Sequence, residues 1–240
     1  GFAWERLVVN AAKINDIKVE CIGYQRSIIT KYSYLIKFNF NNSIYNPDRI
    51  ICKSKINCKK LLSNSSIKKN QVVVSGNLLN KNFKIKKVKK KFGVLVLPES
   101  WEIEEKRLFL FTQLCAKKYP QINFIFRPHP MSIKSITKLK TKNLKNFFVS
   151  ENTFKKDLKN NNIVFFRGSY AAIKACAMGL FPIYVKFKND FDADINPMYE
   201  LEKLIFKIRD PKELKKIIQY LKQSKSNKRK IYIMDHCLRV

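Results

Sequence analysis

Three short polar segments in the second half of the sequence each follow an apolar run. They are Pro98-Glu99-Ser100, Arg127-Pro128-His129-Pro130 and Arg167-Gly168-Ser169-Tyr170. An apolar run of four or five residues that ends at turn residues is typical of a buried strand. If these strands are parallel, the three segments meet at one edge of the sheet, where open α/β sheets bind their ligands. The side chains of these segments are therefore the first candidates for chemistry.

His129 lies between two prolines, two residues after Arg127. Proline fixes φ and removes a backbone donor, so the backbone that carries this imidazole has few accessible conformations. An imidazole and a guanidinium held near each other can both donate hydrogen bonds to phosphate oxygens. A solvated surface turn is the alternative interpretation. We expect Arg127 and His129 to bind an anion.

Gly168 and Ser169 stand between an apolar strand and a helix of small residues that ends at Gly179. Backbone N–H groups and a hydroxyl at such a junction form an anion site, and Gly168 allows the anion to approach closely. The alternative is an ordinary loop in which Ser169 caps the helix. We expect Gly168, Ser169 and Tyr170 to bind the same anion as His129.

Glu99 is the acidic candidate of this half, because a carboxylate at a strand end can bind a ribose hydroxyl or act as an acid or base. The alternative is a solvated loop residue beside Ser100, which we predict to cap the next helix. Ser100 would also line the site. Weaker candidates for lining it follow the apolar runs of the first half; they are Gln25, Arg26, Ser54, Gly76 and Asn77.

Apolar periodicity predicts the elements that position these groups. The predicted strands are 17–23, 48–54, 71–77, 93–97, 123–126, 147–150, 163–166, 182–185 and 204–208, and the predicted helices are 4–14, 56–62, 101–118, 154–158, 170–178 and 211–221. We expect the helix over 101–118 to bury Ile103, Leu108, Phe111, Leu114 and Cys115. The alternation of strand and helix predicts a doubly wound parallel α/β fold.

Domain boundaries follow from composition. The Lys-rich segment 83–92 has no clear period, so we interpret it as a basic linker between residues 1–82 and residues 93–240. The chain starts with Gly-Phe-Ala-Trp rather than Met, which leads us to expect a natural start upstream and an incomplete first domain. No run of about 18 apolar residues exists, so no membrane span is expected.

Lys and Arg number 49 against 18 Asp and Glu, a net charge of +31. Such a charge attracts nucleic acid, an anionic membrane surface or a nucleotide, or it reflects compositional drift towards Lys. No aromatic-interleaved binding motif accompanies it, so we expect no specific nucleic-acid partner. The six cysteines form no C-x-x-C pair and only two histidines accompany them, which argues against a metal site and for core residues in a reducing cytoplasm.

Six segments resemble, in order and spacing, bacterial surface-carbohydrate biosynthesis proteins of the GT-B type. They are Trp4-Glu5-Arg6, Ile22-Gly23-Tyr24-Gln25, Pro47-Asp48-Arg49-Ile50-Ile51, Val74-Ser75-Gly76-Asn77, Phe126-Arg127-Pro128-His129-Pro130 and Gly168-Ser169-Tyr170-Ala171-Ala172-Ile173-Lys174-Ala175-Cys176-Ala177-Met178-Gly179. The last two are also similar to elements of polysialyltransferases and CDP-glycerol glycerophosphotransferases. The sequence departs from the family at Arg26, where His is common, at Tyr170, where Thr or Ser is common, and at Lys174, where an acid is common.

The resemblance implies a glycosyltransferase with two Rossmann-type domains that needs no metal or other cofactor. It implies that His129 and Ser169 bind the phosphate of a donor, with a CMP- or CDP-linked sugar favoured over a UDP-sugar. The acceptor would be a surface polysaccharide or lipopolysaccharide, glycan or lipid-linked. The enzyme would be cytoplasmic, with its basic surface in peripheral contact with the inner membrane. A nucleotide-sugar epimerase and a basic nucleic-acid-binding protein are the alternatives.

Overall fold

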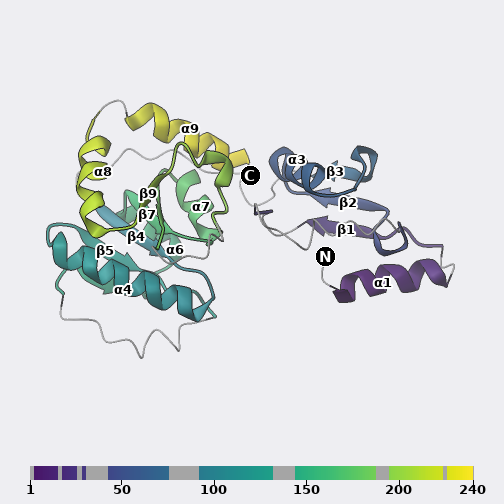
Figure 1. Ribbon diagram of the computed structural model, residues 1–240, viewed down its shortest axis with the longest axis horizontal. Helices are drawn as coiled ribbons and strands as arrows, with labels where there is room; N and C mark the ends of the chain where they lie inside the picture. Colours follow the sequence, from purple (N-terminus) through teal and green to yellow (C-terminus); the bar gives the residue numbers. More distant parts are fainter. Residues whose placement is uncertain are drawn as a thin grey trace. The chain divides into compact units, whose positions relative to one another are not determined.

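The computed structural model describes residues 3–15, 18–25, 29–30, 43–75, 92–131, 144–187, 195–223 and 226–239. The chain divides into two compact units. The first comprises residues 1–81 with 239–240, and the second comprises residues 82–238 (Figure 1).

The first unit contains a small parallel sheet in the order β1-β2-β3. Its elements are α1 (Ala3–Ile14), β1 (Ile22–Gln25), η1 (Ser43–Tyr45), β2 (Arg49–Cys52), α3 (Lys55–Asn64), η2 (Lys69–Gln71) and β3 (Val72–Val74). Helix α3 packs on the sheet around Ile50, Cys52 and Leu61. The predicted start of the first strand is wrong, because residues 18–21 form no strand. Instead, Asp48 holds the chain before β1 by accepting a hydrogen bond from the Cys21 N–H at 2.8 Å.

The second unit contains a six-stranded parallel sheet in the order β6-β5-β4-β7-β8-β9. Its elements are β4 (Gly93–Leu97), α4 (Glu102–Lys118), β5 (Asn123–Phe126), β6 (Phe147–Val149), α6 (Phe154–Asn160), β7 (Ile163–Phe166), α7 (Ala171–Ala177), β8 (Phe181–Val185), η3 (Tyr199–Leu201), β9 (Phe206–Ile208), η4 (Pro211–Glu213), α8 (Leu214–Leu221) and α9 (Ser226–Arg239). Numbered from β4, this is the order 3-2-1-4-5-6 of a Rossmann fold. The predicted class, a doubly wound parallel α/β fold, is confirmed.

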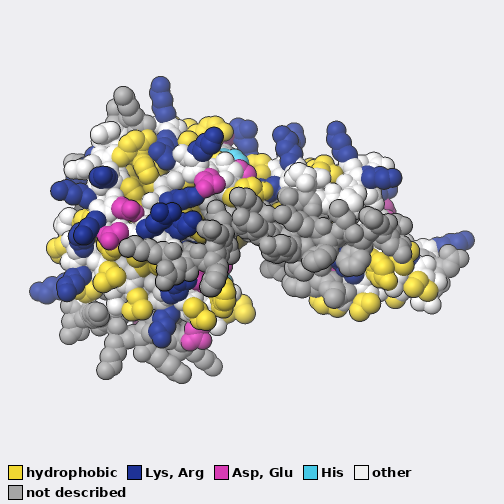
Figure 2. Space-filling model, in the orientation of Figure 1, with side chains coloured by type: hydrophobic (Ala, Val, Ile, Leu, Met, Phe, Trp, Pro, Cys, Tyr) yellow, Lys and Arg dark blue, Asp and Glu magenta, His cyan; other side chains and the backbone are white. Residues whose placement is uncertain are grey.

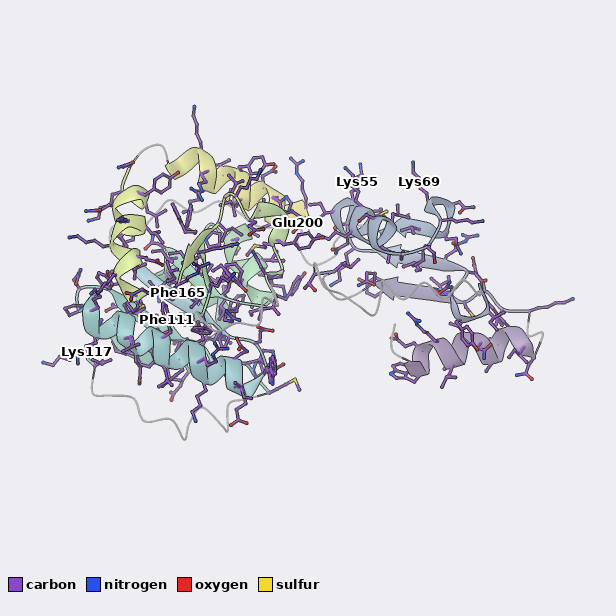
Figure 3. All side chains as sticks on the ribbon, in the orientation of Figure 1. Lys55, Lys69, Phe111, Lys117, Phe165 and Glu200 are labelled. Carbon is purple, nitrogen blue, oxygen red and sulfur yellow. The ribbon has the colours of Figure 1, made fainter. Side chains whose placement is uncertain are left out.

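The strand order places the switch point of the sheet between β4 and β7. From β4 the chain proceeds towards one edge and from β7 towards the other, so right-handed connections place α4 and α7 on opposite faces (Figure 1). Both faces are covered, and β4, β7 and β8 are buried throughout. Figure 3 labels Phe111 of α4 and Phe165 of β7, whose ring centroids are 6.4 Å apart in this core.

Helix α4 differs from its predicted form. It begins after Trp101 as the N-cap residue, whereas Ser100 is exposed and does not cap it. Ile103 and Leu114, which we expected to be buried, are 61% and 54% exposed. Glu104 and Glu105 are buried in their place. The prediction is confirmed for Leu108, Phe111 and Cys115, which are buried. It is wrong at Ile103 because the inward face of the first turn carries carboxylates that bind strand ends instead of an apolar side chain.

The C-terminal helix α9 was not predicted. It starts with a polar, basic stretch, and its buried residues, Ile233, Met234 and Cys237, are confined to its second half. His236 on this helix is half-buried, with Nε2 3.8 Å from Oε1 of Glu200, the acidic residue labelled in Figure 3. The predicted end of α7 is confirmed, because Gly179 follows it with φ of 90°.

Candidate functional site

The strands on either side of the switch point end opposite each other. Leu97 of β4 pairs with Phe166 of β7, and both are the last residues of their strands. Glu99 and Gly168 each lie two residues further on, and the Gly168 N–H donates a hydrogen bond of 2.8 Å to Oε1 of Glu99. A backbone donor and a carboxylate thus meet at the point of the sheet where α/β proteins bind ligands.

The contact between Glu99 and Gly168 requires a glycine. A Cβ atom at position 168 would lie 2.3 Å from Cδ of Glu99, far inside van der Waals contact. Burial raises the pKa of Glu99, while the Gly168 hydrogen bond and the nearby Arg167 charge lower it and the Glu104 charge raises it further. The carboxylate is therefore held by a backbone donor, although partial desolvation destabilises its ionised form.

Arg167 fixes the end of β7 to its neighbours. Its side chain is buried; Nε donates to Oε2 of Glu104 at 2.5 Å, and a terminal nitrogen donates to the Val185 carbonyl at 2.8 Å. The guanidinium also lies 4.7 Å from the centroid of the Phe187 ring. These contacts tie the β7 end to α4 and β8, so they position the backbone of Gly168.

His129 is held by Glu105, the residue of α4 that follows Glu104. Its backbone N–H donates to Oε1 of Glu105 at 3.1 Å. In the ring, Nδ1 accepts from the Met131 N–H at 3.3 Å. Because a nitrogen that accepts a hydrogen bond carries no proton, the neutral ring carries its proton on Nε2, which makes Nε2 a donor. The first turn of α4 therefore supports two strand ends, through Glu104 at β7 and through Glu105 at β5.

Arg127 is committed to the segment after β6. One of its terminal nitrogens donates to Oδ2 of Asp157 at 2.9 Å and to the Asn152 carbonyl at 2.6 Å. Asp157 is fully buried in α6 and also accepts from the Ser150 hydroxyl at 2.6 Å. The structure therefore gives Arg127 a role in joining β5 to α6, and its predicted role as a phosphate ligand stays a prediction.

Ser169 and Tyr170 follow Gly168 directly. Ser169 is buried, and its carbonyl accepts from the Ala172 N–H at 3.2 Å as the first turn of α7 forms. Tyr170, not Ser169, is the residue before the helix. Nζ of Lys174 lies 5.8 Å from the centroid of the Tyr170 ring. Because α7 has only seven residues, the donor that matters most here is the Gly168 N–H rather than the helix terminus.

For the candidate site residues of the first unit, the structure shows no contact that indicates a binding role. Gln25 is the last residue of β1 and is half-buried. Ser54 is buried, and its hydroxyl accepts from the Asn57 N–H at 3.1 Å, so it caps α3. Arg26, Gly76 and Asn77 lie outside the described residues. Ser54 thus has a structural role, and Gln25, Arg26, Gly76 and Asn77 remain predictions as site residues. Ser100, the sixth residue predicted to line the site, is exposed after β4 in the second unit.

Sequence reasoning missed Glu104 and Glu105. A signal was present, because four of the 18 acidic residues of this basic chain are concentrated at positions 99–105. In the part of the chain that the structure describes, no three His, Cys, Asp or Glu side chains gather as metal ligands. None of the described helices is long and apolar enough to cross a bilayer.

The sequence matches no protein-family model and no curated protein. Solved structures, in contrast, share its fold. S. aureus MnaA in a co-structure with UDP matches with a TM-score of 0.59 and 14% identity, over 96% of this chain and 67% of that one. Anabaena Alr3699/HepE in complex with UDP-glucose matches with a TM-score of 0.55 and 14% identity, over 98% and 70%. The kitacinnamycin glycosyltransferase matches with a TM-score of 0.54 and 12% identity, over 82% and 52%.

These likenesses define a class of fold. The chain has the parallel-sheet α/β architecture of GT-B glycosyltransferases. A UDP-N-acetylglucosamine 2-epimerase from Listeria monocytogenes also matches this chain, with a TM-score of 0.52. The chain spans between about half and about seven-tenths of the length of the three structures described first. At these identities the likeness extends to the fold alone.

Proposed function

We propose that the second unit binds the phosphate of a nucleotide-activated sugar at the carboxyl edge of its sheet, and that the protein transfers this sugar to an acceptor. One observation carries the proposal: the Gly168 N–H at the switch point of a Rossmann-ordered sheet already binds a carboxylate. A backbone donor that binds a carboxylate oxygen there has the position and polarity to bind a phosphate oxygen. The UDP and UDP-glucose complexes among the matched structures support a nucleotide ligand.

The transfer requires that the bond between the sugar and the phosphate breaks, that an acceptor oxygen bonds to the sugar, and that the acceptor hydroxyl loses its proton to a base. Negative charge then develops on the leaving phosphate, and fixed donors aimed at it stabilise the transition state. His129 provides such a donor at Nε2, with its backbone held by Glu105 and its ring by Met131. Gly168 provides a second, and the buried Ser169 lies next to it.

The donor and the acceptor are proposed from the resemblance of the His-Pro and Ser segments. A CMP- or CDP-linked sugar is the favoured donor, and a UDP-sugar is the competing one. The acceptor would be a surface polysaccharide or lipopolysaccharide. Lys and Arg side chains are spread over the visible surface of the described residues in Figure 2 rather than gathered over one element. Such a surface favours a diffuse, salt-sensitive attraction to anionic lipid headgroups.

A nucleotide-sugar epimerase is the second candidate, because the matched structures include an epimerase. Both reactions begin with the same donor, so product analysis separates them. Incubation with the donor alone would give an epimer in the second case. A glycosyltransferase needs an acceptor before it gives a glycosylated product.

A thermal-shift panel of CMP, CDP, UDP and GDP tests the proposal. A nucleotide that binds only the folded protein raises its Tm, by a free energy of about 2.7 kcal/mol at a hundredfold excess over Kd. We expect one of the pyrimidine nucleotides to give the largest shift, and a 20-nucleotide RNA to give none at about 0.15 M salt. No shift with any nucleotide, or a shift with RNA alone, would reject the proposal.

His129→Ala tests the site itself. Loss of the Nε2 donor should lower transfer at least tenfold, a loss of about 1.4 kcal/mol of transition-state stabilisation. His236→Ala is the matched control, because His236 is the other histidine of the chain and lies on α9 beside Glu200. It should retain normal activity while folded. Normal activity in His129→Ala, with the same Tm as the wild type, would remove His129 from the site.

A further inference from the structure

The geometry points to Glu99 as a built-in competitor of the donor phosphate: its carboxylate occupies the Gly168 N–H that the phosphate needs, and it must swing away when the nucleotide binds. This inference rests on the proposed function, because it assigns a role to a second anion at the same donor. It makes Glu99 a residue that sets nucleotide affinity.

The Glu99 carboxylate fills the space beside the Gly168 N–H. One oxygen of Glu99 takes the Gly168 N–H at 2.8 Å. The whole carboxylate lies against Gly168, since an added Cβ would meet Cδ at 2.3 Å and both oxygens at 2.3 and 2.5 Å. A phosphate oxygen at hydrogen-bond distance from the same N–H would occupy the space that this carboxylate fills. The two groups therefore exclude each other sterically.

The charges of the Glu99 carboxylate and of a phosphate also oppose simultaneous binding. A carboxylate and a phosphate are both anions, so they repel each other at contact distance in a site that is partly desolvated. The buried Arg167 guanidinium, whose charge lowers the pKa of Glu99, is already paired with Glu104. It does not have a second charge to offer for two anions at once. A bound phosphate thus favours a conformation in which Glu99 has left the site.

The Glu99 carboxylate is held weakly enough to leave Gly168. Among the described residues, its carboxylate makes a hydrogen bond only to Gly168, whereas Glu104 binds both Arg107 and Arg167. Glu99 belongs to the four-residue segment 98–101 between β4 and α4, not to either element. Burial also disfavours its ionised form, which lowers the cost of moving the carboxylate into water.

Nucleotide affinity of Glu99 variants tests the inference. The probe is whichever of CMP, CDP, UDP and GDP gives the largest thermal shift with the wild type, and the measurement is isothermal titration calorimetry. If the open conformation is populated in about 10% of the free protein, truncation of Glu99 tightens binding about tenfold. We expect Glu99→Ala to bind at least tenfold tighter and Glu99→Gln to lie between it and the wild type, because the amide oxygen still accepts from Gly168 without a charge.

Two controls sharpen this test. Glu102→Ala removes an exposed carboxylate from the same turn and should leave the affinity unchanged. The matching nucleoside, which has no phosphate to compete with Glu99, should bind wild type and Glu99→Ala equally. Equal or weaker nucleotide binding by Glu99→Ala would overturn the inference and leave the proposed function standing. If no nucleotide binds the wild type or Glu99→Ala, both fail.

A second measurement needs no nucleotide. Gly168→Ala places a methyl group against the Glu99 carboxylate and should destabilise the wild type, as measured by urea unfolding. In a Glu99→Ala background the same substitution should cost much less, because no carboxylate remains to be expelled. Gly93→Ala, whose Cβ would instead meet Asn161, is the control and should cost the same in both backgrounds. Equal costs of Gly168→Ala in the two backgrounds would show that Glu99 does not rest on Gly168.

Discussion

Two strands of the larger sheet, β5 and β7, are each followed by an arginine and then by a candidate anion ligand. At the end of β7, Arg167 is buried and binds Glu104 of α4, and the next residue, Gly168, holds a carboxylate. At the end of β5, Arg127 is 27% exposed and binds Asp157 of α6. In both places the arginine is engaged in structural contacts. The groups suited to bind a ligand are the ones that follow, the Gly168 N–H and the His129 ring.

Position at a strand end does not by itself make a cation a phosphate ligand. Both guanidiniums have carboxylate partners that are more than nine-tenths buried, and these partners hold the strand ends in place. The two ends differ in how completely the arginine is enclosed. We therefore expect substitutions at the β7 end to affect stability most, those at the β5 end less, and the titration of Glu99 least.

Glu104→Ala should have the largest effect. It leaves the Arg167 guanidinium buried without its carboxylate, and breaking a buried pair in this way costs about 3–5 kcal/mol of unfolding free energy. The measurement is urea unfolding, with Glu102→Ala as a control from the exposed side of the same turn. A loss below about 1 kcal/mol would mean that Arg167 finds another partner or water, and that the β7 end is not fixed by this pair.

Arg127→Met should have a smaller effect, about 1–3 kcal/mol, because Asp157 keeps its hydrogen bond from the Ser150 hydroxyl. Lys155→Met, on the exposed side of α6, is the control and should change stability by less than about 0.5 kcal/mol. Nucleotide affinity of Arg127→Met decides between its two roles. Unchanged affinity is expected of a structural arginine, and a tenfold or larger loss would establish it as the phosphate ligand that the sequence predicts.

The smallest effect concerns pH. Burial raises the pKa of Glu99 above its ordinary value of 4.5 in the folded protein, so the folded state binds this proton more tightly than the unfolded state. Unfolding free energy therefore falls as pH rises through the window just above 4.5, because the unfolded chain releases the proton first. Glu99→Gln lacks this term. The difference in unfolding free energy between the two proteins, followed from about pH 4 to about pH 7, should shift in favour of the variant. A difference that is constant with pH would contradict the raised pKa.

Much of the larger sheet could be predicted from the sequence. The bounds of β4, β5 and β7 match the predicted ranges, because each is a mostly apolar run between turn residues, and β4 and β7 are also buried on both faces. The stop of α7 just before Gly179 could be predicted because only glycine readily adopts the positive φ found there. Strand β1 was harder, because its neighbouring residues 18–20 are exposed and its start is set by the side chain of Asp48.

The candidate site could be predicted only in part. Local patterns located the polar strand ends, but the contact between Glu99 and Gly168 joins residues 69 positions apart and depends on the pairing of β4 with β7. The roles of Glu104 and Glu105 were missed for a related reason. Helical periodicity assigns acidic residues to the solvent side unless their partners are known, and here these partners are the Arg167 side chain and the His129 N–H at the ends of other strands.

Amide NMR of glycine residues tests the central claim, nucleotide binding at the switch point, most directly. The chain has six glycines, so ¹⁵N-glycine labelling gives few signals, and Gly168→Ala assigns the one of interest. On addition of the nucleotide that raises the Tm most, we predict that the Gly168 amide resonance shifts, because its hydrogen bond passes from Glu99 to a phosphate oxygen. Gly93, which begins β4 at the opposite edge of the sheet, and Gly179, beyond the far end of α7, should keep their positions. A saturating nucleotide that leaves the Gly168 signal unmoved would contradict the account.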